Sequence, residues 1–332
     1  MVWESLIGLI ELLIFPGVFF IFWLALTYEW IDRKFYAKLQ NRYGPLHVGA
    51  KGFWQPLADF IKLMVKEDII PAASDRLLFT LTPIFLLTLS LTAFFFVPIV
   101  PLLRNVALAS FEGDLILVIF LLTMIAVVKF LGAWGSTNIF GAVGGVRLAF
   151  QLLGYEIPLA ICLVSAAIVA GSLNISIIAQ YVGSNIIAAI ALLPALAVSI
   201  VCFQAELERI PFDIPEAEQE IVAGWLTEFS GRRLALIRLS IDVELALASA
   251  LLAALFLGGP YGPIIPFLPV QVSYFIWFII KATIILLIFS NIRTLFARLR
   301  IDQMVHFSWK NLAIISLLEI VLIQALLVGG VI

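Results

Sequence analysis

The sequence predicts an all-α integral membrane protein with about eight transmembrane helices and amphipathic helices in its cytoplasmic loops. Of its 332 residues, 63% are apolar and only 13% are charged, and the mean hydropathy is +1.13. Stretches of roughly 20 apolar residues recur, which is the length that crosses a bilayer core about 30 Å thick. We interpret residues 1–332 as a single transmembrane domain with spans at 6–30, 77–100, 115–134, 148–171, 185–204, 232–257, 272–292 and 311–330.

Positive charge is distributed unevenly between the two sets of loops. Loops 31–76, 135–147, 205–233 and 291–310 lie on one side of the predicted membrane and carry 16 of the 20 Lys and Arg residues. Loops rich in Lys and Arg stay on the cytoplasmic side. We therefore expect a multi-pass protein of the cell (plasma) membrane, with these loops in the cytoplasm and both termini outside. The first apolar stretch precedes its positive charges, so we interpret it as a span and not as a signal peptide.

The first charged loop contains a predicted amphipathic helix over Gln55–Glu67. The apolar residues that share one side of it are Leu57, Phe60, Ile61 and Met64. The polar residues expected to face away are Asp59, Lys62 and Lys66. A helix of this kind lies in the plane of the membrane interface. It either anchors the loop or lines a cavity.

The acidic segment, residues 205–231, is the densest collection of charge in the chain. Its six clustered carboxylates, offset by Arg209 alone, are Glu206, Glu208, Asp213, Glu216, Glu218 and Glu220. Asp213 and Glu216 have the spacing of a capping box, which predicts that a helix follows from about Ile214 to Phe229. The alternative is a solvated acidic loop.

Helical spacing in the acidic segment predicts that some of its carboxylates are buried. Residues that fall on one apolar face are Ile214, Ala217, Ile221, Trp225 and Phe229. Glu218 and Glu228 fall on this same face. A carboxylate in such a place is neutral or is paired with a cation or donor. Either state suits proton transfer near neutral pH.

Several ionisable residues lie inside predicted spans, where each is costly and is by default a functional candidate. The candidates well inside spans are Lys129, Glu156, Arg238, Asp242 and Glu244. We interpret Glu156 as part of a proton relay, whereas Arg238 and Asp242 form an i,i+4 pair that neutralises itself or takes part in the relay. The residues nearer span ends, where interfacial placement explains them, are Glu11, Lys281 and Glu319.

The sequence lacks the residue patterns of several kinds of functional site. Cys162 and Cys202 lie in apolar stretches, and only His47 and His306 supply imidazoles, so we expect neither a disulfide nor a metal site. The glycines of Gly141–Gly145 lack the strand of a dinucleotide site. No iron–sulfur cysteine pattern occurs. We therefore do not expect this chain to catalyse a redox reaction alone, and no nucleic-acid partner is indicated.

Three segments, Asp32–Pro71, Arg147–Pro158 and Glu206–Lys310, resemble a known family. The most specific stretch reads ERIPFDIPEAEQEIVAG. It is similar to the membrane subunit of respiratory complex I called NADH dehydrogenase subunit 1 or the H subunit, and to its counterparts in energy-converting membrane-bound [NiFe] hydrogenases. The resemblance implies an eight-helix subunit that joins a soluble redox arm to antiporter-like membrane subunits.

The resemblance also implies roles for residues that match the family's motifs. In the family, the first and last charged loops border a cavity, and the acidic segment leads to a buried chain of charged residues. The expected proton and charge relay consists of Lys129, Glu156, Glu206, Asp213, Glu216, Glu218, Glu220, Glu228, Asp242 and Glu244. The expected cavity and interface residues are Arg33, Arg42, Asp59, Lys62, Arg147, Arg209, Arg293, Arg298, Arg300 and Asp302. The last charged loop is otherwise interpreted as a topological anchor, or as a surface that pairs with the acidic segment or with a partner protein.

Departures from the family's pattern argue against quinone binding and favour the hydrogenase branch. The chain reads Gly44-Pro45-Leu46 where quinone-using members have Gly-Pro-Asn, and Asp242 and Glu244 are slightly out of register with the family's glutamate in the sixth span. The additional Arg238 and the doubled Arg232-Arg233 are similar to the hydrogenase branch. We therefore predict the coupling subunit of an ion-translocating oxidoreductase of membrane-bound hydrogenase type. The nickel–iron site and iron–sulfur clusters are expected in soluble partner subunits, with no cofactor bound by this chain.

Four alternatives remain open from the sequence. The first is a quinone-binding H subunit of an NADH:quinone or related dehydrogenase. The second is the same subunit in a sulfur-reducing relative. The third is an autonomous proton-coupled transporter, which the lack of an internal repeat argues against. The fourth is a passive anchor for the redox arm.

Overall fold

The computed structural model describes residues 2–101 and 107–330, and every regular element within them is helical. The elements are α1 (Val2–Leu13), α2 (Val18–Leu39), η1 (Ala50–Gly52), α3 (Gln55–Val65), α4 (Arg76–Phe94), α5 (Asp114–Gly135), α6 (Ile139–Ala170), α7 (Ile175–Ser184), α8 (Ile186–Ala191), α9 (Leu193–Glu206), α10 (Glu218–Ile221), η2 (Gly224–Leu226), α11 (Gly231–Leu257), α12 (Val270–Leu295), α13 (Ile301–Phe307), η3 (Ser308–Leu312) and α14 (Ala313–Val328). The prediction of an all-α membrane protein is confirmed.

Seven helical stretches in the described residues are long and apolar enough to cross a membrane. They are Gly8–Leu39, Arg76–Phe94, Asp114–Gly135, Ile139–Ala170, Gly231–Leu257, Val270–Leu295 and Ile301–Val328. The span expected at 185–204 is divided into the shorter α8 and α9, which meet at Leu192, and Pro194 lies in the first turn of α9. Proline lacks the N–H that a continuous helix would require there.

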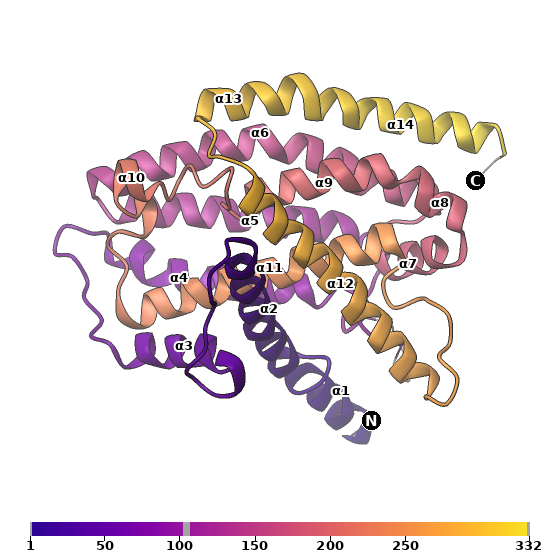
Figure 1. The fold of residues 1–332 in the computed structure, drawn as a ribbon, viewed down its shortest axis with the longest axis horizontal. Coiled ribbons are helices and arrows are strands. Elements are labelled where there is room, and N and C mark those ends of the chain that lie inside the picture. Colours follow the sequence, from indigo (N-terminus) through magenta and orange to yellow (C-terminus); the bar gives the residue numbers. More distant parts are fainter. Residues whose placement is uncertain (1, 102–106, 331–332) are drawn as a thin grey trace.

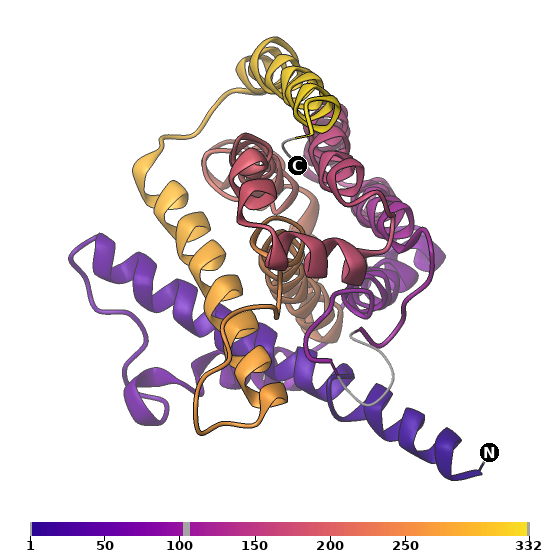
Figure 2. The same ribbon diagram turned by 90° about the vertical axis from the view of Figure 1, so that its right-hand side faces the viewer.

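Helix α11 is the centre around which the other helices pack. Its residues from Val243 to Phe256 are almost entirely buried, and it packs against α2, α3, α4, α7 and α12. Figure 2 shows α11 in the middle of the bundle with other helices around it. Because its side chains contact protein on every side, small residues such as Ala246 and Ala250 allow close packing.

The charged loops gather at one end of the bundle. Figure 1 shows α3, α10 and the start of α13 at this end, and α7, α8 and the end of α14 at the other. Helix α6 begins at Ile139, so Arg147, expected in a loop, lies in the third turn of a 32-residue helix. The charged end is thus formed by loops and by the first turns of the helices.

The acidic segment does not form the helix expected over residues 214–229. Only α10 and η2 are helical, and the predicted capping box at Asp213 is wrong because no helix begins there. Val222 (φ 64°) and Gly224 (φ 53°) have left-handed backbone conformations, which break a right-handed helix. The apolar side chains predicted on one face, from Ile214 to Phe229, are nevertheless all buried.

Close backbone approach explains why this loop requires glycine. A Cβ atom on Gly224 would lie 1.8 Å from the carbonyl oxygen of Pro215, and one on Gly144 of α6 would lie 2.8 Å from the backbone nitrogen of Trp225. The loop therefore packs directly on the α6 backbone. Phe229 then stacks on Phe79 of α4 with ring centroids 4.3 Å apart. These contacts hold the acidic segment in a fixed, irregular path.

The amphipathic helix predicted in the first charged loop is confirmed as α3. Its orientation differs from the expectation in one respect. Asp59 does not face away, because it pairs with Arg33 of α2. Ile61 and Met64, on the apolar side, are exposed on the protein surface, which suits a helix in the plane of the membrane interface. The polar Asp59 thus points into the protein, whereas part of the apolar face points out of it.

Substitution of Gly224 by Ala should disrupt the acidic segment, since the added methyl group overlaps the Pro215 backbone. Gly171 is a matched control, because it also has a positive φ (64°) but no atom within 4 Å of an added Cβ. Gly171→Ala should cost only about 1–2 kcal/mol for the left-handed conformation. We expect a clearly larger drop in the melting temperature of the purified complex for Gly224→Ala. Equal drops would contradict the close approach.

Candidate functional site

A cavity of about 800 Å³ opens at the charged end of the bundle, between α2, α3, α11 and the acidic segment. The carboxylate residues in its wall are Glu29, Asp59, Glu208, Asp213, Glu216, Glu218 and Asp242. The cationic residues are Arg33, Lys129, Arg209, Arg238, Arg293 and Arg298. Apolar side chains of α2 and α3, such as Leu26, Phe60 and Leu63, cover one side. The wall therefore combines nearly balanced charge with an apolar surface.

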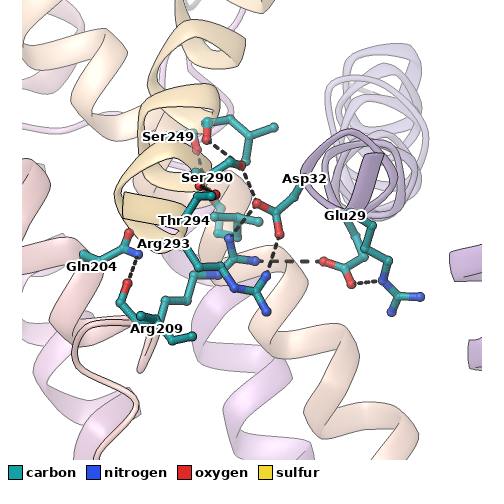
Figure 3. A network of polar contacts seen from close by, with 12 residues as sticks. Glu29, Asp32, Gln204, Arg209, Ser249, Ser290, Arg293 and Thr294 are labelled. Carbon is teal, nitrogen blue, oxygen red and sulfur yellow. Dashed lines mark hydrogen bonds and ion pairs between the residues drawn. The ribbon is translucent and has the colours of Figure 1, made fainter. Parts of the chain in front are cut away.

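Asp32 of α2 is the centre of an ion cluster beside this cavity. It is fully buried, and its Oδ1 and Oδ2 atoms each lie 3.1 Å from a guanidinium nitrogen, of Arg209 and Arg293 respectively. Ser290 of α12 donates a further hydrogen bond to Asp32. Figure 3 shows these side chains converging from α2, α12 and the acidic segment. One carboxylate thus ties together three segments that are distant in the sequence.

The outer part of the same cluster connects α2 to α3. Glu29 accepts a hydrogen bond from Arg33, and Arg33 donates another, of 2.7 Å, to Asp59. Gln55 holds the second oxygen of Asp59 at 2.8 Å. Glu29 and Asp32 were not among the residues predicted from the sequence. Their spacing with Arg33, at positions i, i+3 and i+4 of one helix, places all three on one face and was the available signal.

Lys129 of α5 forms a second ion cluster, deeper in the bundle. It is 2% exposed, and its Nζ atom lies 3.0 Å from Glu208 Oε1 and 2.9 Å from Glu244 Oε2. Trp225 Nε1 donates a 3.0 Å hydrogen bond to the other oxygen of Glu208. Burying charges is costly unless they are paired and hydrogen-bonded in this way. Lys129 and Glu244, predicted from the sequence, are thereby brought together, and Glu208 is an additional member.

The backbone at Glu208 makes this arrangement possible. Helix α9 ends at Glu206, and Glu208 has a φ of 53°, a left-handed conformation that a non-glycine residue adopts at a cost of about 1–2 kcal/mol. The resulting turn directs Glu208 to Lys129 while the next residue, Arg209, reaches Asp32. Adjacent residues of the acidic segment therefore take part in both ion clusters.

Two small cavities continue from Lys129 toward the middle of the membrane-spanning region. The first, of about 10 Å³, is lined by Lys129, Glu208 and Glu206, and the second, also of about 10 Å³, by Glu206 and Glu156. Each is close to the smallest space, about 10–15 Å³, that holds one water molecule. Thr123 donates a hydrogen bond to Glu156 at the far end. Polar side chains thus lead from the large cavity to Glu156.

The acidic segment is also clamped from outside by two arginines. Glu220 Oε2 lies 2.6 Å from Arg147, and its Oε1 lies 3.4 Å from Arg298, which is also 3.5 Å from Asp213. The hydrogen bond from Arg147 lowers the pKa of Glu220 below its ordinary value. The last charged loop therefore pairs with the acidic segment through Arg298.

Two other carboxyl groups of the segment have a raised pKa because they are buried. It raises the pKa of Asp213, although Arg298 lowers it in part. Burial, with a further contribution from Glu208, raises the pKa of Glu216 to about 7. A carboxyl group with such a pKa changes its charge close to neutral pH. Both groups lie in the wall of the large cavity.

Some residues that were predicted for the relay or the cavity lie outside the two ion clusters. Glu218 is exposed at the cavity, so its predicted burial is wrong. Glu228 is half-buried and accepts a hydrogen bond from Asn138. Glu218 diverges from the expectation because residues 214–229 do not form one helix, whereas Glu228 has a hydrogen-bond donor as expected. The predicted residues that are exposed at the charged end are Arg42, Lys62, Arg300 and Asp302.

The predicted pairing of Arg238 with Asp242 is also absent from the ion pairs of the described residues. Both side chains line the large cavity, one turn apart on α11. The charges that act on Asp242 include those of Glu29, Arg33 and Arg209 as well as Arg238. In residues 2–101 and 107–330, no group of three or more His, Cys, Asp or Glu side chains is arranged to hold a metal ion.

Comparison with known proteins shows the family of this chain. Residues 11–324 match the protein family described as NADH dehydrogenase. The chain belongs to the family of NADH dehydrogenase subunit 1, also called the H subunit. It is 37% identical over 311 residues to the NADH-quinone oxidoreductase H 2 subunit of Geobacter sulfurreducens, with 92% of each chain covered. It is 35% identical over 306 residues to the H 2 subunit of Syntrophobacter fumaroxidans, with 89% of each chain covered.

Because the chain belongs to this family, the two ion clusters lie in a membrane subunit of a complex I-like oxidoreductase. A third relative, the NADH-quinone oxidoreductase H subunit of Rubrobacter xylanophilus, is 34% identical over 303 residues, covering 91% of this chain and 90% of that one. The matched region includes the first charged loop, the acidic segment and the last charged loop. Membership of the NADH dehydrogenase subunit 1 family, which the sequence resemblance predicted, is therefore confirmed.

Replacement of Lys129 by Met should destabilise the protein by about 3–5 kcal/mol, because Glu208 and Glu244 would remain buried without their cation. Combining Lys129→Met with Glu208→Gln and Glu244→Gln should recover most of this loss. Lys62→Met is the control, since Lys62 is exposed on α3, and it should change stability by no more than about 0.5 kcal/mol. Thermal denaturation of the purified complex measures all three. Equal effects of Lys129→Met and Lys62→Met would contradict the pairing.

Proposed function

We propose that this chain couples electron transfer in a docked soluble arm to ion translocation across the membrane. The observation that carries the proposal is the series of polar groups that line successive cavities, from the charged-end cavity through Lys129, Glu208 and Glu206 to Glu156. A chain of ionisable groups at this depth is characteristic of proton pathways in membrane proteins. The chain itself supplies binding, charge and proton transfer, and redox chemistry belongs to partner subunits.

In the proposed mechanism, a charge change in the cavity alters the partners of the buried cations. Protonation of Glu216 or Asp213 removes a negative charge from the wall that also contains Glu208. Lys129 then loses the attraction of that group, so the carboxylates that remain charged provide a larger share of its stabilisation. A shift of Lys129 toward either Glu208 or Glu244 changes the field at Glu206, which lines the next cavity. The proton affinity of the buried series thereby responds to events at the charged end.

The complex is proposed to be of membrane-bound hydrogenase type. Support comes from Leu46 in the first-loop motif and from Arg238, whose side chain lines the cavity and adds positive charge there. Partners would be soluble hydrogenase-like or dehydrogenase-like subunits with iron–sulfur clusters, and antiporter-like membrane subunits. The charged end would face the cytoplasm, in accord with its Lys and Arg residues.

A quinone-binding role is the second candidate function. The relatives from Geobacter sulfurreducens and Syntrophobacter fumaroxidans are named NADH-quinone oxidoreductase subunits. The cavity has a size typical of small-molecule sites, which span about 300–1,000 Å³. Leu26, Phe60 and Leu63 provide an apolar side against which a quinone ring would pack. A sulfur-reducing complex would use the same coupling path, with its distinguishing chemistry in the soluble subunits.

Substitution of Glu156 by Gln should block proton transfer at the far end of the series. Positioned acid–base groups accelerate proton transfer by about 10²- to 10⁴-fold, so proton translocation should fall by about 10²-fold or more. Glu67→Gln, which removes an exposed carboxylate at the charged end, is the control. The measurement is the ratio of protons moved to electrons transferred by the complex in liposomes. An unchanged ratio in Glu156→Gln would disprove the relay, and an effect on assembly alone would favour a passive anchor.

Purification of the native complex through a tag on this chain distinguishes a hydrogenase-type complex from a quinone-binding one and from an autonomous transporter. We expect mass spectrometry to identify cluster-bearing and antiporter-like subunits, and metal analysis to find nickel with no stoichiometric quinone. Quinone without nickel, lost in Asp59→Asn, would instead establish the quinone-binding role. Purification without partners, together with transport by the isolated chain in liposomes, would identify an autonomous transporter.

A further inference from the structure

A further buried carboxyl group lies in a membrane-spanning helix, away from the cavity. Glu319 of α14 is 3% exposed, and its Oε1 atom has no hydrogen-bond partner in the structure. Helix α14 packs against α6 and α9, and Figure 1 shows it along the outer side of the bundle. Glu319 faces inward from this outer helix. The interfacial placement expected for Glu319, from a position interpreted as nearer the end of its span, is therefore wrong.

Glu319 lies beside the interruption between α8 and α9. The first N–H groups of a helix have no partner within that helix, and the carboxyl group of Glu319 lies against the backbone N–H of Ala195 in the first turn of α9. Interrupted helices within membranes place polar backbone groups in the protein interior, where ion and substrate sites form. The position therefore combines an uncovered helix start with a buried acid.

One face of α9 connects this position to the acidic series that begins at the cavity. Ala195, Ser199, Cys202 and Glu206 follow at intervals of three or four residues, so they share one face of the helix. The Ser199 hydroxyl is fully buried and has no hydrogen-bond partner, and it lies beside the Cys162 thiol of α6. The face extends about 17 Å, at about 1.5 Å per residue. It forms a polar stripe through an otherwise apolar region.

Glu319 has no neighbouring cation to stabilise a negative charge. The titratable group beside it on the packed helices is Cys162 of α6, and Cys202 and Glu206 lie farther along α9. The ion pairs of the described residues do not include Glu319. A carboxyl group buried without a cation is more stable in its neutral form. Glu319 is thus placed to bind a proton.

We propose that Glu319 is a further intramembrane proton-binding site, located where α6, α9 and α14 meet. The carboxylate takes up one proton on an oxygen atom and releases the same proton when the surroundings become alkaline. Proton binding at Glu319 does not depend on the coupling role proposed for the cavity. It places a proton-binding group on the outer side of the bundle.

Infrared difference spectroscopy of the purified complex between acidic and alkaline buffer tests this site. Glu319→Gln keeps an oxygen acceptor for the Ala195 N–H but exchanges no proton. We expect this variant to lose one protonated-carboxyl band that is present in the unaltered complex and in the control Glu112→Gln, which changes an exposed carboxyl at the end of the bundle near α7. An identical spectrum in Glu319→Gln would overturn the proposal and leave Glu319 as a helix cap only.

A second measurement needs no substitution. Dicyclohexylcarbodiimide reacts with protonated carboxyl groups in apolar surroundings, and peptide mass spectrometry locates the adduct. We expect modification of Glu319 to be several-fold greater in acidic than in alkaline buffer. Equal modification at both, or none, would overturn the proposal. A normal proton-to-electron ratio in Glu156→Gln would disprove the coupling role of the cavity without altering either readout at Glu319.

Discussion

Lys129 is buried between Glu208 and Glu244, and neither its charge nor theirs is stable at that depth without the others. This triad joins α5, α11 and the acidic segment, so the loop that carries Glu208 must descend into the bundle. That descent creates the floor of the large cavity. It also places Glu206 one small cavity farther along. The site therefore follows from the requirement that buried charges be paired.

Because its backbone path is irregular, the short acidic segment forms ion pairs with residues of several helices. A continuous helix would direct its carboxylates around a single axis, whereas the observed loop sends Glu208 to Lys129, Arg209 to Asp32 and Glu220 to Arg147. Gly224 and the packing of Trp225 on α6 hold this path in place. The segment behaves as a rigid connector between ion clusters because its apolar side chains are buried.

Much of this architecture could be predicted from sequence because apolar length and charge placement follow directly from the bilayer. The helix over 214–229 was wrong, since spacing alone does not reveal the left-handed backbone at Val222 and Gly224. Asp32 was missed because a charge at the end of an apolar stretch resembles an interfacial flank. Glu319 was misplaced for the same reason. Such a residue is buried or exposed according to which helices pack around it. The sequence alone does not show that tertiary packing.

The seven carboxylates and six cations of the cavity wall have a further consequence for how it responds to its surroundings. With all of them ionised, the wall carries one excess negative charge. Uptake of a single proton makes it electrically neutral. Glu216, with a pKa of about 7, is suited to take that proton near neutral pH. A proton taken up there removes one negative charge from the wall and so weakens the attraction of the wall for a cation.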